Sequence, residues 1–165
     1  MKILIISDSH GNITNIKSVM EIARKSKMDA VIHAGDWNTP ESAETVLSYN
    51  ILTFTVLGNA DIAPEVEKKL KTKSKKFDKN FLVLDLAGKK IGITHKPSDN
   101  NSFFKKGKSF AGDGLDLIVN GHLHSKFYKE EKGTRIVRPG ALVSAINFAV
   151  YDTVKDEVDF INEDD

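Results

Sequence analysis

The sequence contains no cysteine among its 165 residues. Disulfide bonds and thiolate-held zinc are therefore excluded, and any metal ion must be bound by nitrogen and oxygen donors. No apolar run approaches the roughly 18 residues that a membrane-spanning helix needs. The apolar start, residues 1–6, is too short for a signal peptide. These absences predict a cytoplasmic protein without membrane contact.

Neither sign of charge dominates, since 24 lysines and arginines face 23 acidic residues. Nucleic-acid-binding domains are usually basic, so this balance argues against an obligate nucleic-acid partner. The exception is the lysine-rich segment from Lys68 to Lys79, which we interpret as a solvated helix end and loop rather than as a surface for anionic substrates. No linker or repeat interrupts the chain, so we expect one domain over residues 1–165.

The first half of the chain alternates between strand-like and helix-like segments. Asn12 is placed to cap a helix with an apolar face from Ile13 to Ala23, and Pro40 suits the first turn of another. This alternation favours a parallel α/β arrangement. The predicted strands are Lys2–Ser7, Ala30–Ala34 and Ile51–Leu57, and the later helices are Pro40–Ser48 and Pro64–Leu70.

The second half is richer in strands. Residues 80–86 and 90–94 flank a hairpin turn at Ala87-Gly88-Lys89, and a polar helix is predicted over 101–111. A buried strand is predicted at Asp116–Asn120. Antiparallel strands then follow at Lys126–Glu130, Thr134–Arg138, Val143–Tyr151 and Glu157–Ile161. Two sheets packed face to face, with helices outside, would accommodate this pattern.

Metal-ligand side chains recur just after the predicted strands. In a parallel sheet, ligands gather at the carboxyl ends of strands, so these segments are expected to converge on one crevice. Residues i and i+2 on extended backbone point the same way, so Asp8 and His10 can reach one ion together. The segments are Asp8-x-His10, Gly35-Asp36, Gly58-Asn59, His95 and Gly121-His122-x-His124.

In this order the five segments resemble the signature blocks of the calcineurin-like metallophosphoesterases. Arg138-Pro139-Gly140-Ala141 resembles a later Asn-Pro-Gly-Ser turn of that family. The short length is similar to its small, single-domain phosphodiesterase branch of bacteria and archaea. The resemblance implies an α/β fold, a four-layer α/β/β/α sandwich of two stacked mixed β-sheets flanked by helices.

The resemblance also implies roles for the matching residues. Asp8, His10 and His124 would hold one divalent metal ion, while Asn59, His95 and His122 would hold a second. Asp36 would bridge the two ions, and Asp36, Asn59, His95 and His122 form the expected catalytic group. Mixed carboxylate, amide and imidazole donors favour transition metals, with Mn²⁺ first and Ni²⁺, Fe²⁺, Co²⁺ or Zn²⁺ as alternatives. The implied reaction is attack by a metal-activated water at the dinuclear centre, without a covalent intermediate.

Two residues depart from the family pattern. Ala60 stands where many members have a histidine that assists the leaving group, so we expect slow turnover and a preference for good leaving groups. Lys96 stands where glycine is common, and it either contacts the substrate phosphate, as Asn59 would, or faces solvent. His33 and Asp61 are expected behind the ligands. His33 would be buried near Asp36. In the family, the residue at the position of Asp61 supports the histidine that Ala60 replaces here. Because that histidine is absent, we expect Asp61 to cap the following helix.

The leading hypothesis is a metal-dependent phosphodiesterase of small or nucleotide-like phosphodiesters. A phosphomonoesterase, a nuclease and a protein-binding scaffold of the same fold are the alternatives. A degraded metal centre would favour the scaffold, and all seven ligand positions are intact here. The apolar C-terminal strands leave open either a homodimer edge or plain core.

Overall fold

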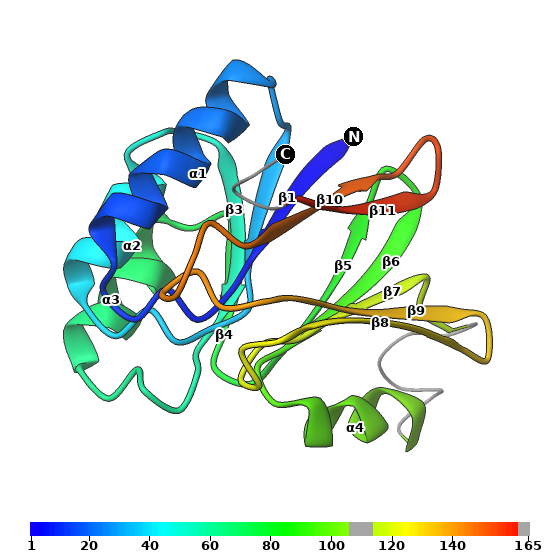
Figure 1. Cartoon of the computed structure of the whole chain (residues 1–165). Helices are drawn as coiled ribbons and strands as arrows, with labels where there is room; N and C mark the ends of the chain where they lie inside the picture. The colour runs from blue at the N-terminus through cyan, green and yellow to red at the C-terminus, as the bar shows by residue number, and fades with distance from the viewer. Residues whose placement is uncertain (106–113, 162–165) are drawn as a thin grey trace.

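A computed structural model describes residues 1–105 and 114–161 (Figure 1). Its first sheet has the strand order β11-β10-β1-β2-β3-β4. Neighbours from β1 to β4 run parallel, while β10 and β11 are antiparallel additions at the other edge. The predicted parallel half is therefore confirmed. The strands are β1 Lys2–Ile6, β2 Ala30–His33, β3 Leu52–Val56, β4 Lys76–Asp78, β10 Phe148–Asp152 and β11 Glu157–Ile161.

Three helices cover the outer face of this sheet: α1 Ile13–Lys25, α2 Pro40–Leu47 and α3 Pro64–Lys73. Both residues predicted to begin a helix, Asn12 and Pro40, are confirmed in that role. The Asn12 side chain accepts a hydrogen bond from the Asn15 N–H at 3.1 Å, and Pro40 begins α2. The apolar stripe of α1 packs on the sheet through Ile16, Val19, Met20 and Ala23.

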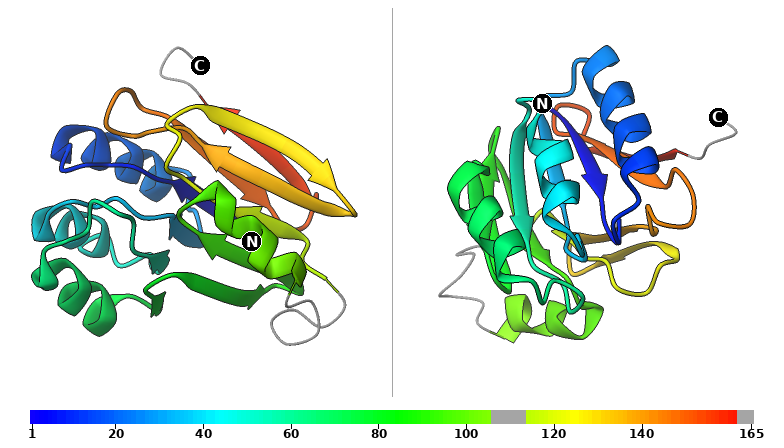
Figure 2. Two further views of the ribbon diagram at one scale, coloured as in Figure 1. Left: turned by 90° about the horizontal axis from the view of Figure 1, so that it is seen from below. Right: turned by 90° about the vertical axis from the view of Figure 1, so that its left-hand side faces the viewer.

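The second sheet has the order β5-β6-β7-β9-β8 and packs face to face against the first. A short turn, η1 Pro97–Asp99, leads into α4 Asn100–Lys105, which lies over its outer face (Figure 2). The layers are thus helix, sheet, sheet and helix, and the predicted mixed α/β sandwich is confirmed. The strands are β5 Phe81–Leu86, β6 Lys89–Thr94, β7 Leu117–Val119, β8 Lys126–Glu131 and β9 Thr134–Pro139.

Several element predictions need correction. The strand predicted at Val143–Tyr151 begins only at Phe148, because the Val143 N–H donates to the Asp8 carbonyl at 3.0 Å instead of joining a ladder. The lysine-rich segment contains β4, an edge strand in which lysine is tolerated and Phe77 packs inward. β9 is antiparallel to β8 but parallel to β7. The helix predicted over 101–111 spans Asn100–Lys105 within the described residues, and positions 106–111 lie outside them.

Over residues 1–105 and 114–161, no helix has the length and apolar character needed to cross a membrane.

Candidate metal centre

The loops that follow β1, β2, β3, β6 and β7 converge at the carboxyl ends of these strands, and they carry all seven predicted metal ligands. Backbone hydrogen bonds join neighbouring loops. The Asp8 N–H donates to the Gly35 carbonyl at 3.0 Å, and the Gly121 N–H donates to the His95 backbone carbonyl at 2.9 Å. The parallel order of β1–β2–β3 and of β6–β7 places these loop starts at one edge. The expected convergence of the segments is thus what the fold produces.

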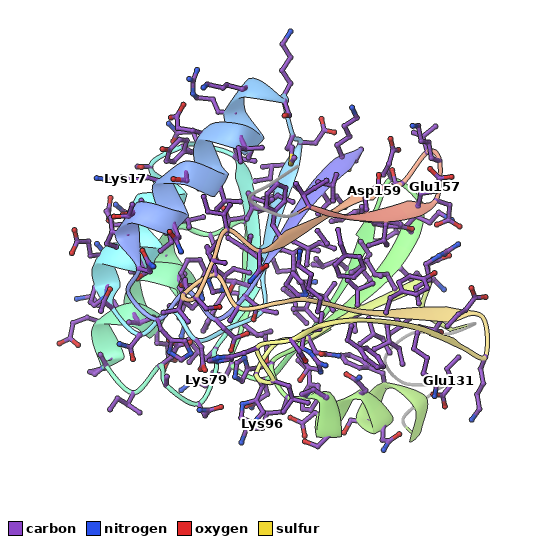
Figure 3. All side chains as sticks on the ribbon, viewed as in Figure 1. Lys17, Lys79, Lys96, Glu131, Glu157 and Asp159 are labelled. Atoms are coloured by element: carbon purple, nitrogen blue, oxygen red, sulfur yellow. The ribbon has the colours of Figure 1, made fainter. Side chains whose placement is uncertain are left out.

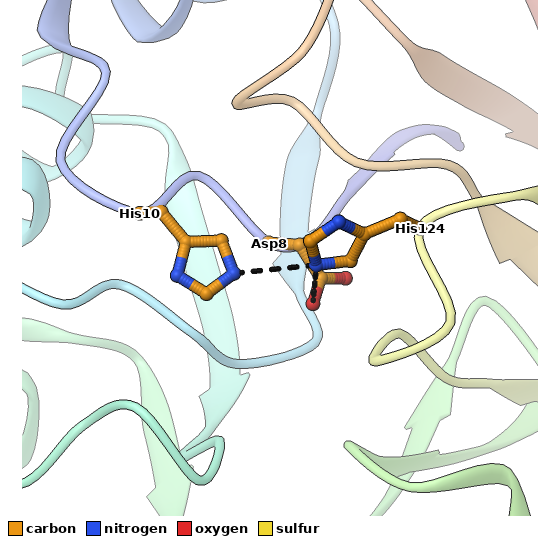
Figure 4. A group of neighbouring side chains, drawn as sticks. All are labelled: Asp8, His10 and His124. Carbon is orange, nitrogen blue, oxygen red and sulfur yellow. Dashed lines mark hydrogen bonds and ion pairs between the residues drawn. The ribbon is translucent and has the colours of Figure 1, made fainter.

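Asp8, His10 and His124 form one cluster of ligand atoms that lie within 4.8 Å of one another (Figure 4). The two Nε2 atoms of His10 and His124 are 3.4 Å apart. His124 Nε2 lies 3.6 Å from Asp8 Oδ1. Asp8 is fully buried whereas His124 is exposed, so the cluster opens from the interior toward solvent.

Asp8, Asp36 and His95 form a second, wholly buried cluster. Asp36 Oδ2 lies 3.4 Å from His95 Nε2 and also 3.4 Å from His10 Nε2. One carboxylate oxygen therefore stands between the histidines of the two clusters. Burial alone would raise the pKa of Asp36, but the His95 imidazole, the Ala60 N–H and the His10 imidazole together lower it below its usual value.

The His95 ring is oriented by a backbone group. Its Nδ1 lies 2.8 Å from the Ala34 carbonyl oxygen, so a proton on Nδ1 leaves the Nε2 lone pair facing Asp36 and Asn59. Asn59 Oδ1 is 3.2 Å from His95 Nε2. Burial disfavours the His95 cation, yet the Asp36 carboxylate and the Ala34 carbonyl outweigh burial and raise the pKa of His95.

His122 belongs to neither cluster. Its ring lies edge-on to that of His95, with centroids 5.2 Å apart. The His122 backbone N–H donates to both oxygens of Asp8, at 3.1 and 3.0 Å. His122 thus borders the site through its ring and fixes Asp8 through its backbone.

Five of the seven predicted ligands have a left-handed backbone, with φ between 41° and 71°. Left-handed backbone at a residue other than glycine costs on the order of 1–3 kcal/mol and is concentrated at functional sites. Tertiary hydrogen bonds help to hold this backbone conformation. At His10, for example, the N–H donates to the Asp36 carbonyl at 3.0 Å. The residues concerned are Asp8, His10, Asp36, His122 and His124.

Two glycines permit the close approach of these loops. A Cβ on Gly58 would overlap Asp36 Oδ1, and a Cβ on Gly121 would overlap Ser7 Oγ and lie 2.6 Å from Asp8 Oδ2. Any larger residue at either position would displace a carboxylate of the site.

Asp61 lies behind Asp36 and ties two loops together. Its Oδ2 accepts the N–H groups of Asp36 at 3.0 Å and Gly58 at 2.8 Å, and its Oδ1 accepts the Asn38 N–H at 2.7 Å. Burial raises the pKa of Asp61 against the effect of these donors. The expectation that Asp61 caps α3 is wrong, because the cap residue is Ala63 and it makes no side-chain capping bond.

His33 is buried below the site and held as a neutral ring. The Gly35 N–H donates to its Nδ1 at 3.2 Å, so the proton is on Nε2, which lies 3.0 Å from Ser9 Oγ. The ring stacks on Trp37 at 3.6 Å between centroids. Burial lowers the pKa of His33 to about 3. His33 therefore supports the loops on either side of it.

Sequence reasoning missed two kinds of supporting residue. Ala60, notable for the side chain it lacks, donates its backbone N–H to Asp36 Oδ1 at 2.8 Å. The loop after β9 braces the first cluster, because the Leu142 N–H bonds the Ser7 carbonyl and the Ala141 N–H bonds the His124 carbonyl, each at 3.0 Å. Only the resemblance of residues 138–141 to a family turn pointed to this loop.

The donor chemistry fits divalent cations. Asp8 and Asp36 are buried carboxylates that share a cluster, and no lysine or arginine among the described residues forms an ion pair with either of them. Buried carboxylates are costly unless cations offset their charge. Imidazole and carboxylate donors at this spacing suit a transition-metal ion.

Comparison with known proteins agrees with this fold. The sequence model described as "Calcineurin-like phosphoesterase superfamily domain" matches residues 1–156. Phosphodiesterase MJ0936 of Methanocaldococcus jannaschii is 26% identical over 166 residues, which cover 95% of this chain and 96% of that protein. "Probable metallophosphoesterase YsnB" of Bacillus subtilis is 26% identical over 148 residues, covering 86% and 75%. A solved structure of an archaeal phosphodiesterase superposes with a TM-score of 0.84 at 23% identity, covering 98% of this chain and 99% of that one.

The class defined by this fold and site is thus the metallophosphoesterases. The chain belongs to the calcineurin-like phosphoesterase superfamily and is a hydrolase of phosphoric esters.

Proposed function

We propose that the chain is a phosphodiesterase with a dinuclear centre of two divalent transition-metal ions, Mn²⁺ being the first candidate. The observation that carries the proposal is the position of Asp36 Oδ2, at 3.4 Å from a histidine of each cluster. One ion would be held by Asp8, His10 and His124. The other would be held by Asn59, His95 and His122, with Asp36 between the two ions. His122 lies outside both clusters, and its support as a ligand is the edge-on contact of its ring with that of His95, 5.2 Å between centroids.

Bound divalent ions would supply positive charge for the phosphoryl oxygens and activate water for attack. The chain's own groups would orient the substrate. Asn59 is exposed and presents its amide beside His95. Lys96, which follows His95 in the chain, is also exposed and adds a cation. His95 keeps its Nε2 directed at the site through the bond to Ala34.

The preference for diesters with good leaving groups rests on Ala60. Its side chain carries no proton donor, and its N–H is already engaged by Asp36. A leaving oxygen therefore receives no proton from this position, and general acid assistance of about 10²–10⁴ in rate is missing. A cytoplasmic location and one domain over the whole chain stay predictions of the sequence, and the C-terminal strands leave the choice between a homodimer edge and plain core open.

Hydrolysis of bis(p-nitrophenyl) phosphate by chelator-treated protein tests the proposal, with Mn²⁺, Ni²⁺, Zn²⁺ or Mg²⁺ restored separately. We expect turnover only with a restored metal, and slower turnover of p-nitrophenyl phosphate under the same conditions. Faster hydrolysis of the monoester would make the chain a phosphomonoesterase. Bound metal without hydrolysis of either ester would favour the scaffold.

A further inference from the structure

A depression of about 270 Å³ adjoins the second cluster. Its lining includes Asn59 and His95 but none of the first cluster. The remaining walls come from both sheets, since Lys79 and Asn80 follow β4 and Lys96 follows β6. This volume suits a small polar group next to the reacting phosphate.

The charge of the depression is net positive. Lys79 and Lys96 line it together with one carboxylate, that of Asp99. Figure 3 shows both lysines at the same end of the molecule. The Lys79 ammonium lies 3.0 Å from Glu67, while Lys96 forms no ion pair with any residue in 1–105 or 114–161. An anionic group would therefore meet one unpaired ammonium and one shared with Glu67.

One residue of the lining, Thr94, carries a buried hydroxyl. Thr94 is 1% exposed, and its Oγ1 finds no hydrogen-bond partner among the described residues. Buried polar groups are normally hydrogen-bonded, so this hydroxyl leaves one polar group behind the wall of the depression without a partner.

We propose that this depression is a subsite for the non-reacting part of the substrate and that it selects phosphodiesters carrying a second phosphate group. The proposal rests on the proposed function, because it assumes that the scissile phosphate lies at Asn59 and His95. Lysine ammonium groups act as point charges for phosphate. Lys79 is the specificity-determining residue that the sequence alone left in a solvated lysine-rich segment.

The test compares thymidine 5′-(p-nitrophenyl phosphate) with the same ester carrying a 3′-phosphate, using the full chain loaded with Mn²⁺. One exposed charge contact at about 4 Å is worth about 1 kcal/mol, or roughly 5-fold. We expect the wild type to favour the 3′-phosphorylated ester in kcat/KM by at least about 5-fold. Lys79→Gln should reduce that preference without abolishing it, because Lys96 remains in the depression, and 0.5 M salt should weaken it.

Two further variants make the test specific. Glu67→Gln should increase the preference, because it frees the Lys79 ammonium. Lys71→Gln removes an equivalent charge from the exposed face of α3, outside the depression, and should leave the preference unchanged. Each preference is a ratio measured on one preparation, so differences in metal loading cancel.

Equal kcat/KM values for the two esters in the wild type would overturn the subsite while their hydrolysis upholds the phosphodiesterase. Absence of hydrolysis of both esters would overturn the phosphodiesterase. In that case, calorimetry tests the subsite separately, by comparing the affinities of the protein for thymidine 3′,5′-bisphosphate and thymidine 5′-monophosphate. Tighter binding of the bisphosphate that Lys79→Gln weakens supports the subsite, and equal binding of the two ligands refutes it.

Discussion

Replacing Asp61 with asparagine should destabilise the fold and disturb the metal centre together. The Asp61 carboxylate accepts three backbone N–H groups, two on Oδ2 and one on Oδ1. An asparagine keeps the shape but turns an NH₂ group toward at least one of these donors. The conflict falls on the N–H of Asn38 or on those of Asp36 and Gly58, depending on the amide orientation.

The expected loss follows from those bonds. A hydrogen bond to a charged group contributes about 1.5–3 kcal/mol to stability. Part of the loss is offset because burying a neutral amide costs less desolvation free energy than burying a carboxylate. We expect the free energy of unfolding to fall by about 2 kcal/mol. For a chain of this size the melting temperature should drop by roughly 4–8 °C.

Urea unfolding of the metal-free protein measures the change through Trp37, the single tryptophan, which is fully buried and stacked on His33. Asp152→Asn is the control, because Asp152 accepts two backbone N–H groups in the β10–β11 turn, away from the metal loops. A loss below 0.5 kcal/mol for Asp61→Asn, or one no larger than that of the control, would refute the reasoning. If the variant loses the expected stability but keeps its affinity for Mn²⁺, Asp61 supports the fold and not the metal centre.

Three other outcomes follow from the structure. Asp36→Asn should abolish hydrolysis and lower the metal retained after dialysis, measured by plasma mass spectrometry; near-wild-type activity in the folded variant would reject Asp36 as the bridging ligand. Ala60→His should raise the turnover of diesters with poor leaving groups by about 10²-fold over Ala60→Gln, whereas equal rates would show that this position cannot deliver a proton. His33 is buried with a pKa near 3, so the unfolded chain takes up the proton first as the pH falls below about 6.5, and stability should decline by up to about 1.4 kcal/mol per pH unit. In His33→Gln, urea unfolding at pH 7, 6 and 5 should show a shallower decline, and identical slopes would contradict this origin.

Local sequence patterns determined much of the fold. The β-branched runs of β1, β2 and β3, the Asn12 cap and the position of Pro40 depend on residues within a few positions of one another, and each matches the structure closely. The order of ligand types after successive strands also sufficed to predict which loops converge.

Other features were decided only by tertiary contacts. His10 and His124 meet across 114 positions, and the Val143 N–H turns to Asp8 instead of continuing a strand. Asp61 serves the loops of Asp36 and Gly58 rather than the helix beside it. Such pairings depend on the packing of two sheets, and periodicity within one segment carries no information about its distant neighbours. The sequence by itself determined which side chains could bind a metal, and the packing of the sheets decided which of them lie together and what surrounds them.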